Sequence, residues 1–551
     1  MTTAHELIMD GRTEEFWQKC CGYIDLSIDQ FMTIQNQLLL EQIELLKKCE
    51  LGQKLMRGVA PQSVAEFRRE VPLTTYASYV PYLPDKNEDA LPAKPVMWQR
   101  TSGRSDEFDC KWVPLSERAY EELGDVFMSL LLFASCNQRN HVALKARNKF
   151  LYGLAAPPYA SGCWALRAER DGVFDWMPPL AEAQSMEFRQ RIEVGFRQGM
   201  AEGIDMMGAI SSVLVAIGER FGQGGGMGRV IPLLNQPRML MRLLKAVLKS
   251  KLARRPLMPR DIWTLRGLLS GGADASVYRH KIKELWGREP LDVYAAAESS
   301  LIATQTWDYG DMTFIPNLSF YEFLTEEEYA KWAQDHSYQP PTRLLDEVSP
   351  GERYGIVITS FHGGAFVRYV LGDILTITSS RNEQLNINLP QMVFYGRADD
   401  IIDFAAFTHA FFTEKSTWQA IHNTGIDYVD WVARKEAVNE APLLHIYIEL
   451  KEEGSIGEEQ VTELLHREIA KINKDYEDLE RFFGFRPLKV TLLPGGSFAE
   501  YMARQKEAGA DLAHIKPPHM SPSDSVMNAL LGKEMVTALF PADTSKAKLT
   551  S

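Results

Sequence analysis

The chain has 551 residues, which is too long for one compact core, so two or three packed units are expected. Apolar residues make up 45% and charged residues 24%, as in ordinary globular proteins, and the net charge is −13. That charge excludes a general nucleic-acid binder, which needs many cationic phosphate contacts, but it does not exclude a nucleotide ligand at a locally positive site.

The N-terminus and the cysteines favour a cytoplasmic protein. Residues 1–6 read MTTAHE and are not the start of a basic stretch with a long apolar run, so no signal peptide is predicted. No window of about 20 apolar residues predicts a membrane span. The six cysteines include no Cys-x-x-Cys pair, which favours reduced thiols over a zinc site or a disulfide framework.

Helical spacing dominates the first half of the chain. Apolar residues recur at this spacing from Phe31 to Leu46, and the same pattern covers residues 186–220. From about residue 290 onward, short apolar runs at 291–294, 354–359 and 374–377 predict strands. Helices followed by strands favour an α/β fold whose sheets are covered by helices.

A smaller second unit is predicted beyond about residue 400. Alternating apolar residues at 444–450 and 488–492 flank a helical pattern at 461–472, which predicts a strand–helix–strand module. We therefore expect a large N-terminal domain over residues 1–396 and a small C-terminal domain over residues 397–551.

A loop of small hydroxyl residues and glycine is the first candidate for binding phosphate. Residues 99–106 read QRTSGRSD, and Lys111 follows them. Glycine allows backbone N–H groups to approach a phosphate closely, and the hydroxyls add donors. No Walker A pattern is present, and an ordinary surface turn is the alternative interpretation.

Two further segments have the composition of ligand-binding turns. Residues 270–275 read SGGADA, and paired glycines let a flat ring lie against the backbone, although they also suit a plain turn. Residues 294–298 read YAAAE and end a predicted strand with a carboxylate. Glu298 is then either a polar or metal contact at the end of that strand or an exposed glutamate.

Charged residues mark three later segments. Residues 368–373 read RYVLGD, and a carboxylate directly after a glycine turn can accept both hydroxyls of a ribose. Residues 396–400 read GRADD at the predicted domain junction, where they form either a solvated turn or a hinge. Lys516 precedes two prolines in HIKPPH, which hold it in an extended conformation; a solvated lysine is the alternative.

In this order and spacing, these segments resemble the acyl-adenylate-forming superfamily of luciferase and acyl-CoA synthetases. Within it, the chain is most similar to the auxin-responsive Gretchen Hagen family of acyl acid–amido synthetases and its bacterial relatives. The resemblance covers nearly all of residues 60–520. The segments that carry it include FRREVPLTTY at 67–76, IPNLSFYEF at 315–323 (similar to MPNxxYFEF), VRYVLGD at 367–373, GGSF at 495–498 (GTF) and IKPP at 515–518 (YKTP).

The resemblance implies a ligase that uses ATP to adenylate a carboxylic acid and passes the acyl group to an amino acid or amine, releasing AMP and pyrophosphate. It implies ATP and Mg²⁺ as cofactors and a small α+β C-terminal lid. The residues implied to bind ATP are Thr101, Ser102, Gly103, Arg104, Ser105, Gly271, Gly272, Ala273, Tyr294, Asp373 and Arg397.

The resemblance also implies catalytic and hinge residues. Glu298 would hold Mg²⁺ or the phosphate network, Lys516 would reach the carboxylate and the α-phosphate, and Asp399 or Asp400 would be the pivot of the lid. No motif marks the acyl pocket. The apolar residues expected to line it are Trp164, Trp176, Met177 and Leu214.

The phosphate loop departs from the family pattern, SSGTSxGExK. Arg104 replaces a threonine, residues 106–109 (DEFD) replace the second glycine, and one residue is inserted before Lys111. Arginine can bind phosphate through two N–H groups, whereas the added carboxylates repel it. The departure leaves catalytic competence open.

Residues 229–260 form a basic segment, with nine Lys and Arg residues and no Asp or Glu. Its leucines, at helical spacing from Leu240 to Leu252, predict an amphipathic helix whose apolar face packs on the core. Contact with an anionic membrane surface or an acidic partner such as a carrier protein is the alternative.

Three functions stay open from the sequence. The first is amide formation, the second is thioester formation with coenzyme A or an acyl carrier protein, and the third is binding without catalysis in a relative with an altered phosphate loop. Pyrophosphate release separates the third from the others, and amine and thiol acceptors separate the first two.

Overall fold

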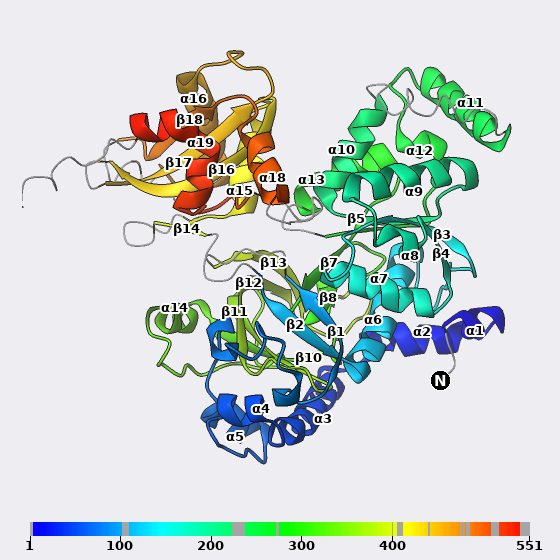
Figure 1. Ribbon diagram of the computed structural model, residues 1–551, viewed down its shortest axis with the longest axis vertical. Coiled ribbons are helices and arrows are strands. Elements are labelled where there is room, and N and C mark those ends of the chain that lie inside the picture. The colour runs from blue at the N-terminus through cyan, green and yellow to red at the C-terminus, as the bar shows by residue number, and fades with distance from the viewer. Residues whose placement is uncertain are drawn as a thin grey trace, which may run out of the picture. The chain divides into compact units, whose positions relative to one another are not determined.

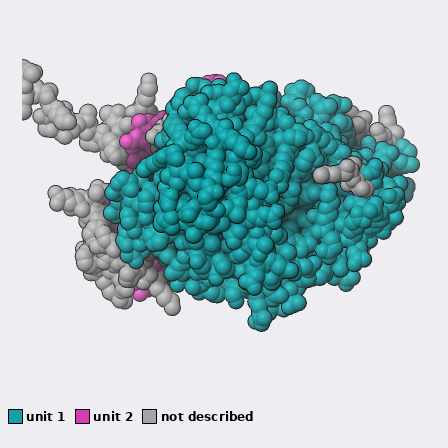
Figure 2. All heavy atoms as spheres, turned by 90° about the horizontal axis from the view of Figure 1, so that it is seen from below, with its two compact units in different colours: residues 1–395 teal, residues 396–551 magenta. Residues whose placement is uncertain are grey.

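A computed structural model of the chain describes residues 4–101, 110–222, 237–271, 275–398, 401–404, 411–438, 441–473, 476–477, 480, 485–507 and 517–539 (Figure 1). The chain divides into two compact units, unit 1 over Met1–Tyr395 and unit 2 over Gly396–Ser551, which are coloured separately in Figure 2. No helix in the described ranges is both long and apolar enough to cross a membrane.

Unit 1 contains most of the helices and strands. Its helices are α1 (Ala4–Met9), α2 (Thr13–Cys21), η1 (Gly22–Asp25), α3 (Ile28–Leu46), α4 (Glu50–Leu55), α5 (Val64–Glu70), η2 (Tyr76–Tyr79), η3 (Glu88–Ala90), α6 (Glu117–Ser135), α7 (Ala160–Arg170), α8 (Leu180–Ala183), α9 (Phe188–Glu202), α10 (Ser211–Gly222), α11 (Pro237–Leu252), α12 (Pro259–Ile262), α13 (Ala275–Trp286) and α14 (Glu326–Gln334). Its strands are β1 (Pro95–Arg100), β2 (Trp112–Ser116), β3 (Asn148–Gly153), β4 (Phe174–Met177), β5 (Met206–Ala209), β6 (Gly267–Ser270), β7 (Leu291–Ala296), β8 (Ser300–Thr304), β9 (Met312–Phe314), β10 (Ser319–Thr325), β11 (Arg353–Ser360), β12 (Tyr369–Ser379) and β13 (Gln391–Arg397).

One 11-stranded sheet organises unit 1, in the order β10-β11-β12-β13-β9-β8-β7-β6-β5-β3-β4. The strands from β7 to β4 pair in parallel, as crossover helices require, and the pairs β10-β11, β11-β12, β13-β9, β9-β8 and β8-β7 are antiparallel. Strand β7 therefore joins the parallel half to the antiparallel half.

Two hydrophobic cores lie on opposite faces of the parallel half. Phe150 and Met206 belong to the larger core, whereas Leu151 and Met207 belong to the smaller one. Successive side chains of a strand point to opposite faces, so β3, β4, β5 and β6 each supply both cores. This explains why these strands read as short, continuous apolar runs.

The apolar residues expected to line an acyl pocket are divided between these two cores. Trp164 and Trp176 lie in the larger core, and Met177 and Leu214 lie in the smaller one. Trp176 and Met177 are adjacent on β4 and so point to opposite faces. The expectation that these four residues line one pocket was wrong.

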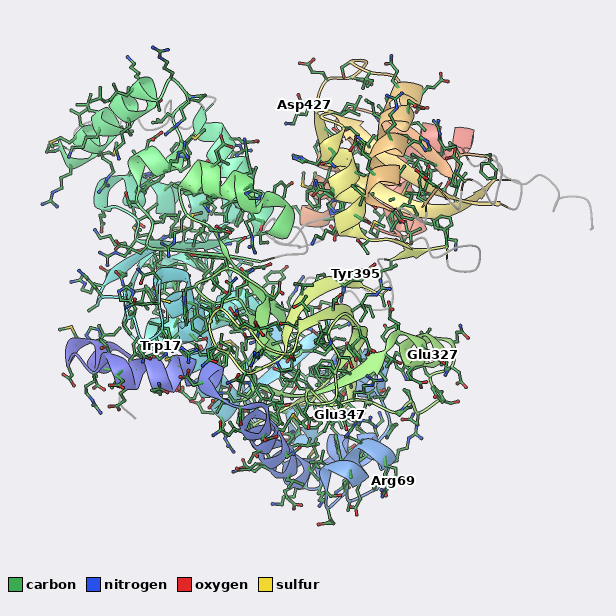
Figure 3. All side chains as sticks on the ribbon, turned by 180° about the vertical axis from the view of Figure 1, so that it is seen from behind. Trp17, Arg69, Glu327, Glu347, Tyr395 and Asp427 are labelled. Atoms are coloured by element: carbon green, nitrogen blue, oxygen red, sulfur yellow. The ribbon has the colours of Figure 1, made fainter. Side chains whose placement is uncertain are left out.

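The N-terminal helices cover the larger core. The α3 prediction is confirmed: Ser27 and Gln30 form a capping box at the start of α3, and Phe31 and Leu46 are buried. Trp17 of α2, which is labelled in Figure 3, is fully buried. Its ring centroid lies 5.9 Å from that of Phe133 on α6. The burial of these aromatic rings fixes the N-terminal helices on α6.

Two sequence expectations in the region 186–260 were correct only in part. The helical pattern over residues 186–220 is interrupted by β5, all four residues of which are buried. A short buried strand and a buried helix turn have the same apolar pattern, so periodicity alone does not separate them. In α11, Leu243 packs against the smaller core, but Leu244 and Leu248 are each 60% exposed and do not pack on it.

Unit 2 is a small α+β unit. Its elements are β14 (Ile402–Asp403), β15 (Phe411–Phe412), α15 (Glu414–Asn423), β16 (Tyr428–Val438), β17 (Ala441–Leu450), α16 (Glu458–Ile472), β18 (Leu488–Leu493), α18 (Ser497–Glu507) and α19 (Asp524–Leu539). Strand β17 pairs antiparallel with β16 and parallel with β18. The predicted strand–helix–strand module is confirmed, and α16 is its helix.

Candidate active site

A lysine, a glutamate and a tyrosine from three separate segments of unit 1 meet in space. The Nζ atom of Lys111 lies 2.9 Å from the hydroxyl oxygen of Tyr369 and 3.5 Å from Oε1 of Glu298. The Tyr369 hydroxyl donates to the same Glu298 oxygen at 3.3 Å. The charged side chains are only 19% and 9% exposed, so each depends on the other for charge compensation. We call these three residues the Glu298 centre.

Lys111 of the Glu298 centre also contacts the start of the candidate phosphate loop. The backbone N–H of Thr101 donates to the Lys111 carbonyl at 3.0 Å, and the Lys111 N–H donates to Oγ1 of Thr101 at 3.1 Å. Thr101 and Lys111 therefore lie side by side, and the Lys111 side chain contacts Glu298. Ser102, Gly103, Arg104 and Ser105 belong to the segment between them and lie outside the described residues.

A second polar pair joins β7 to β12. The Tyr294 hydroxyl donates to Oδ2 of Asp373 at 2.8 Å. Tyr294 is four residues before Glu298, and Asp373 is four residues after Tyr369. Strands β8, β9 and β13 stand between β7 and β12 in the sheet, so the antiparallel half curves until β7 and β12 face each other.

Both partners of this pair lie at irregular positions in their strands. The β11–β12 register shifts between the pairs Gly355–Ile374 and Val357–Val370, which leaves a bulge on β12 that contains Gly372 and Asp373. Gly372 has φ +82°, a conformation that L side chains rarely adopt. The glycine that we expected in a turn therefore lies in a β-bulge, which redirects the Asp373 side chain.

Tyrosine 76 supports the Glu298 centre from the outside. Its hydroxyl accepts from the Trp112 N–H at 2.7 Å and lies 3.2 Å from the Trp112 carbonyl oxygen, to which it donates. Burial raises the pKa of Tyr76 to about 12, so its ring stays neutral at physiological pH. The Lys111 ammonium lies 5.7 Å from the ring centroids of both Tyr76 and Tyr369, within cation–π range.

A buried ion pair anchors the start of β12. Arg368 and Glu322 are 2% and 1% exposed, and Nη2 of Arg368 lies 2.8 Å from Oε1 of Glu322. Nη1 of Arg368 donates to the backbone carbonyl of Arg68 at 2.6 Å. Removing one partner of such a pair leaves an unpaired buried charge, so the pair fixes the backbone next to Tyr369. We assign Arg368 a structural role.

A small cavity of about 30 Å³, roughly the share of one water molecule, lies beside Glu298. Its walls come from β2, α6, the turn after β7 and the segment 360–366. Its lining includes Val113, Leu115, Ala297, Leu318, Phe361 and Phe366. The cavity thus places an apolar wall next to Glu298.

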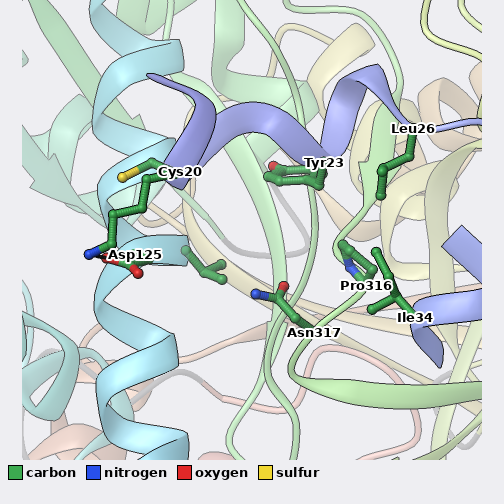
Figure 4. Close-up of a pocket in the computed structure, with 9 residues that line it drawn as sticks. Cys20, Tyr23, Leu26, Ile34, Asp125, Pro316 and Asn317 are labelled. Carbon is green, nitrogen blue, oxygen red and sulfur yellow. Dashed lines mark hydrogen bonds and ion pairs between the residues drawn. The ribbon is translucent and has the colours of Figure 1, made fainter. Parts of the chain in front are cut away.

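A larger cavity of about 180 Å³ lies between α2, α3 and α6 in unit 1 (Figure 4). Lys19 and Asp125 form an ion pair at 2.8 Å on its wall. Pro316 and Asn317 form another part of its lining. None of the residues expected to bind ATP lines this cavity in the described part of the chain.

Profiles of the GH3 family match three segments of the chain. The N-terminal domain matches residues 22–158, the central domain residues 312–397 and the C-terminal domain residues 414–525. Together they cover more than half of the chain.

The chain belongs to the GH3 family.

Solved structures agree with this assignment at the level of the fold. AtGH3.15 acyl acid amido synthetase in complex with 2,4-DB is 16% identical, covers 93% of this chain and 95% of its own, and has a TM-score of 0.66. 2-Hydroxyisobutyryl-CoA ligase in the postadenylation state with 2-HIB-AMP is 13% identical, covers 89% and 87%, and has a TM-score of 0.51. A search of curated protein sequences gives no significant match.

In this GH3-family chain, the structure brings together part of the expected site. Thr101 and Glu298 contact Lys111, and Tyr294 contacts Asp373. Gly271 follows β6 beside β7: an added Cβ would lie 3.7 Å from Cγ1 of Val293, an ordinary contact, so packing does not demand a glycine.

Arg397 is the last residue of β13, which also carries the Phe394 ring 5.6 Å from that of Tyr294. Further expected residues lie outside the described part of the chain: Gly272, Ala273, Asp399, Asp400 and Lys516.

Sequence reasoning missed Tyr369 and Tyr76 as functional residues. Both stand inside segments that carry the family resemblance, 367–373 and 67–76, and that was the available signal. Their contacts depend on the curvature of the sheet and were not visible in the spacing.

Proposed function

We propose that this chain is an ATP-dependent ligase that adenylates a carboxylic acid and transfers the acyl group to an amino acid or amine. The observation that carries the proposal is the Glu298 centre, in which Glu298 pairs with Lys111, the residue that follows the candidate phosphate loop and contacts Thr101 at its start, in a GH3-family chain. The names of the similar structures, an acyl acid amido synthetase and an acyl-CoA ligase with a bound acyl-AMP, support the same chemistry.

The reaction has two balanced steps. The acid's carboxylate oxygen bonds to the α-phosphorus of ATP, the bond from that phosphorus to the bridging oxygen breaks, and pyrophosphate leaves. The amine nitrogen then attacks the acyl carbon, AMP leaves and the amine loses a proton. Negative charge gathers around phosphorus in the first step, so fixed cations that face it lower the barrier.

Glu298 is the residue that we propose to hold Mg²⁺. No cluster of three potential metal ligands exists among the described residues. Magnesium in nucleotide sites commonly uses one or two carboxylates with phosphate and water oxygens, so a single glutamate fits. The ion would supply positive charge against the phosphates when bound, while Lys111 and Tyr369 orient the Glu298 carboxylate.

Asp373 is proposed to accept the ribose hydroxyls. Replacement of Asp373 by alanine is expected to weaken ATP binding about fivefold, roughly 1 kcal/mol, because one acceptor of a buried hydrogen bond is lost. Calorimetric titration with ATP measures the effect. Tyr294→Phe is the matched control, because it removes the same internal hydrogen bond and keeps the carboxylate. Equal ATP affinity in Asp373→Ala and the wild type would reject the assignment.

We propose that Lys516 supplies the cation that faces the α-phosphate, and that unit 2 fixes the chain just after it. The imidazole of His519 lies 2.5 Å from Oε1 of Glu414 and 2.7 Å from Oδ1 of Asp430. Both ring nitrogens thus lie within hydrogen-bond distance of a carboxylate oxygen, which holds the ring from two sides. The ring also stacks on Trp431 with centroids 4.6 Å apart.

His519→Gln is expected to lower the rate of adenylation about fivefold, roughly 1 kcal/mol, because a less constrained lysine spends less time in the reactive position. His466→Gln, also in unit 2, is the control for loss of an imidazole that hydrogen-bonds to Tyr476. Pyrophosphate release measured at saturating ATP gives the rate. An unchanged rate in a folded His519→Gln protein would show that His519 has no role in adenylation.

Two further assignments belong to the proposal. Asp399 or Asp400 is the hinge between an adenylation domain over 1–396 and a lid over 397–551, and Gly271, Gly272, Ala273, Arg397 and residues 101–105 complete the ATP site. We place the protein in the cytoplasm, which the six free cysteine thiols support.

A panel of carboxylic acids tests the proposed function directly. Each acid is incubated with the chain, ATP and Mg²⁺, first alone and then with amino acids or coenzyme A. Acid-dependent pyrophosphate release and an amide product mass are expected. A thioester mass with no amide would assign the chain to the alternative acceptor, and no pyrophosphate with any acid would favour a non-catalytic relative.

A further inference from the structure

Helix α11 (Pro237–Leu252) has two apolar faces, and only one of them packs on the protein. Met239, Ala246 and Ser250 are buried on the inner face. On the same side, Arg242 donates from Nη1 to the carbonyls of Met200 at 2.6 Å and Gly199 at 3.3 Å. These contacts attach α11 to α9 and leave the other face of α11 outward. Figure 1 shows α11 as the outermost helix on its side of unit 1.

The outward face of α11 carries a stripe of large apolar side chains. The exposed fractions are 40% for Leu240, 58% for Met241, 60% for Leu244, 60% for Leu248 and 76% for Leu252. At about 100° per residue, these five positions fall within an arc of roughly 120° opposite the buried face. Elsewhere in the described chain, no single element exposes two large apolar residues. An exposed stripe of this size marks an interaction surface.

Cationic side chains border the stripe. The exposed cations on and next to α11 are Arg238, Lys245, Lys249, Lys251 and Arg254, and α11 contains no acidic residue. None of the five forms an ion pair with a carboxylate in the described ranges. The whole chain carries a net charge of −13, so this cluster is a local reversal of sign.

We propose that α11 docks unit 1 on an anionic lipid surface. A helix that lies in the plane of a bilayer needs an apolar face that enters the acyl boundary and cations that reach the phosphate headgroups, and α11 presents both. Lysine stems can cover apolar surface while their ammonium groups stay among the headgroups. A second copy fits less well, because a symmetric pairing of these faces sets like charges against each other. This inference does not rest on the proposed ligase reaction.

Vesicle co-sedimentation of the full chain tests the proposal. Vesicles of phosphatidylcholine with phosphatidylglycerol are compared with vesicles of phosphatidylcholine alone, at low and high salt. We expect at least about tenfold stronger binding to the anionic vesicles, and weaker binding at high salt, because several cations contribute near an anionic surface. Absence of binding to anionic vesicles would overturn the proposal.

Paired substitutions separate the apolar and the electrostatic contributions. Leu244→Ser with Leu248→Ser is expected to lower vesicle binding about tenfold, and Lys245→Gln with Lys249→Gln about tenfold with a smaller salt dependence. The controls are Leu40→Ser, an exposed leucine of α3, and Lys281→Gln with Lys471→Gln, which make the same charge change elsewhere. The controls should bind as the wild type does.

Other occupants of the stripe give different results. Binding to polyglutamate but not to anionic vesicles would indicate that the stripe binds an acidic protein, such as a carrier protein, and not a lipid surface. Sedimentation velocity can instead be used to detect a dimer. A dimer that Leu244→Ser with Leu248→Ser dissociates, in a protein that does not bind vesicles, would indicate that the stripe binds a second copy of the chain. Equal vesicle binding by the leucine variant and the wild type would also overturn the proposal. Circular dichroism confirms folding, and pyrophosphate release without vesicles stays independent of these changes.

Discussion

Glu298→Gln is expected to lower acid-dependent pyrophosphate release about a hundredfold, roughly 2.7 kcal/mol of barrier. The amide keeps the shape of the side chain but loses the charge that pairs with Lys111 and the oxygen site proposed for Mg²⁺. The Glu298 side chain is 9% exposed, so little solvent screens the lost charge. Steady-state pyrophosphate release at several Mg²⁺ concentrations gives both the rate and the metal dependence.

Two comparisons make this result specific. Tyr369→Phe removes the hydroxyl that donates to Glu298 and should have a smaller effect in the same direction. Glu383→Gln changes an exposed glutamate that pairs with Arg381 and should match the wild type. If Glu298→Gln releases pyrophosphate at the wild-type rate, then Glu298 has no part in adenylation.

Lys516→Ala is expected to slow adenylation by at least about tenfold, roughly 1.4 kcal/mol, because the cation proposed to face the charge on the α-phosphorus is removed. Single-turnover release of pyrophosphate isolates this step. Lys471→Ala is the control, since Lys471 is 68% exposed on α16 of the same unit. The effect should be confined to the first half-reaction.

A synthetic acyl adenylate tests whether the effect of Lys516→Ala is confined to the first half-reaction. Lys516→Ala, given a synthetic acyl-AMP and an amine, should form the amide at close to the wild-type rate. Pyrophosphate has already left in this substrate, so no further negative charge develops at the phosphorus. Equal loss of both half-reactions would assign Lys516 to substrate binding or folding. An unchanged rate of pyrophosphate release would remove Lys516 from the mechanism.

Much of the fold was predictable because burial imposes a period on the sequence. The alternation at 444–450 and 488–492 and the helical spacing at 461–472 predicted the β17–α16–β18 module, and the structure confirms it. The buried runs at 354–359 and 374–377 likewise correspond to β11 and β12. Strand β5 was not predicted, and it shows the limit of predicting elements from periodicity. Four buried residues are too few for periodicity to distinguish a strand from a helix.

The candidate site was predictable only in part. The sequence indicated Glu298 and Asp373 because each carboxylate stands at a glycine- or alanine-rich segment in the family order. It did not indicate that Tyr369 and Lys111 hold Glu298, because those contacts join residues 71 and 187 positions from Glu298 in the chain. Three intervening strands and the bulge at Gly372 set these distances.

The sequence by itself determined most of the helices and strands, the family and the types of side chain available for chemistry. The spacing of apolar residues and the order of the motifs can be read directly from it. Only the tertiary structure decided which side chains meet and which faces stay outside. The curvature of the sheet brings Tyr294 to Asp373, and α9 covers one apolar face of α11 and leaves the other in solvent. A helical period reports that a face is apolar, but what covers that face depends on the rest of the fold.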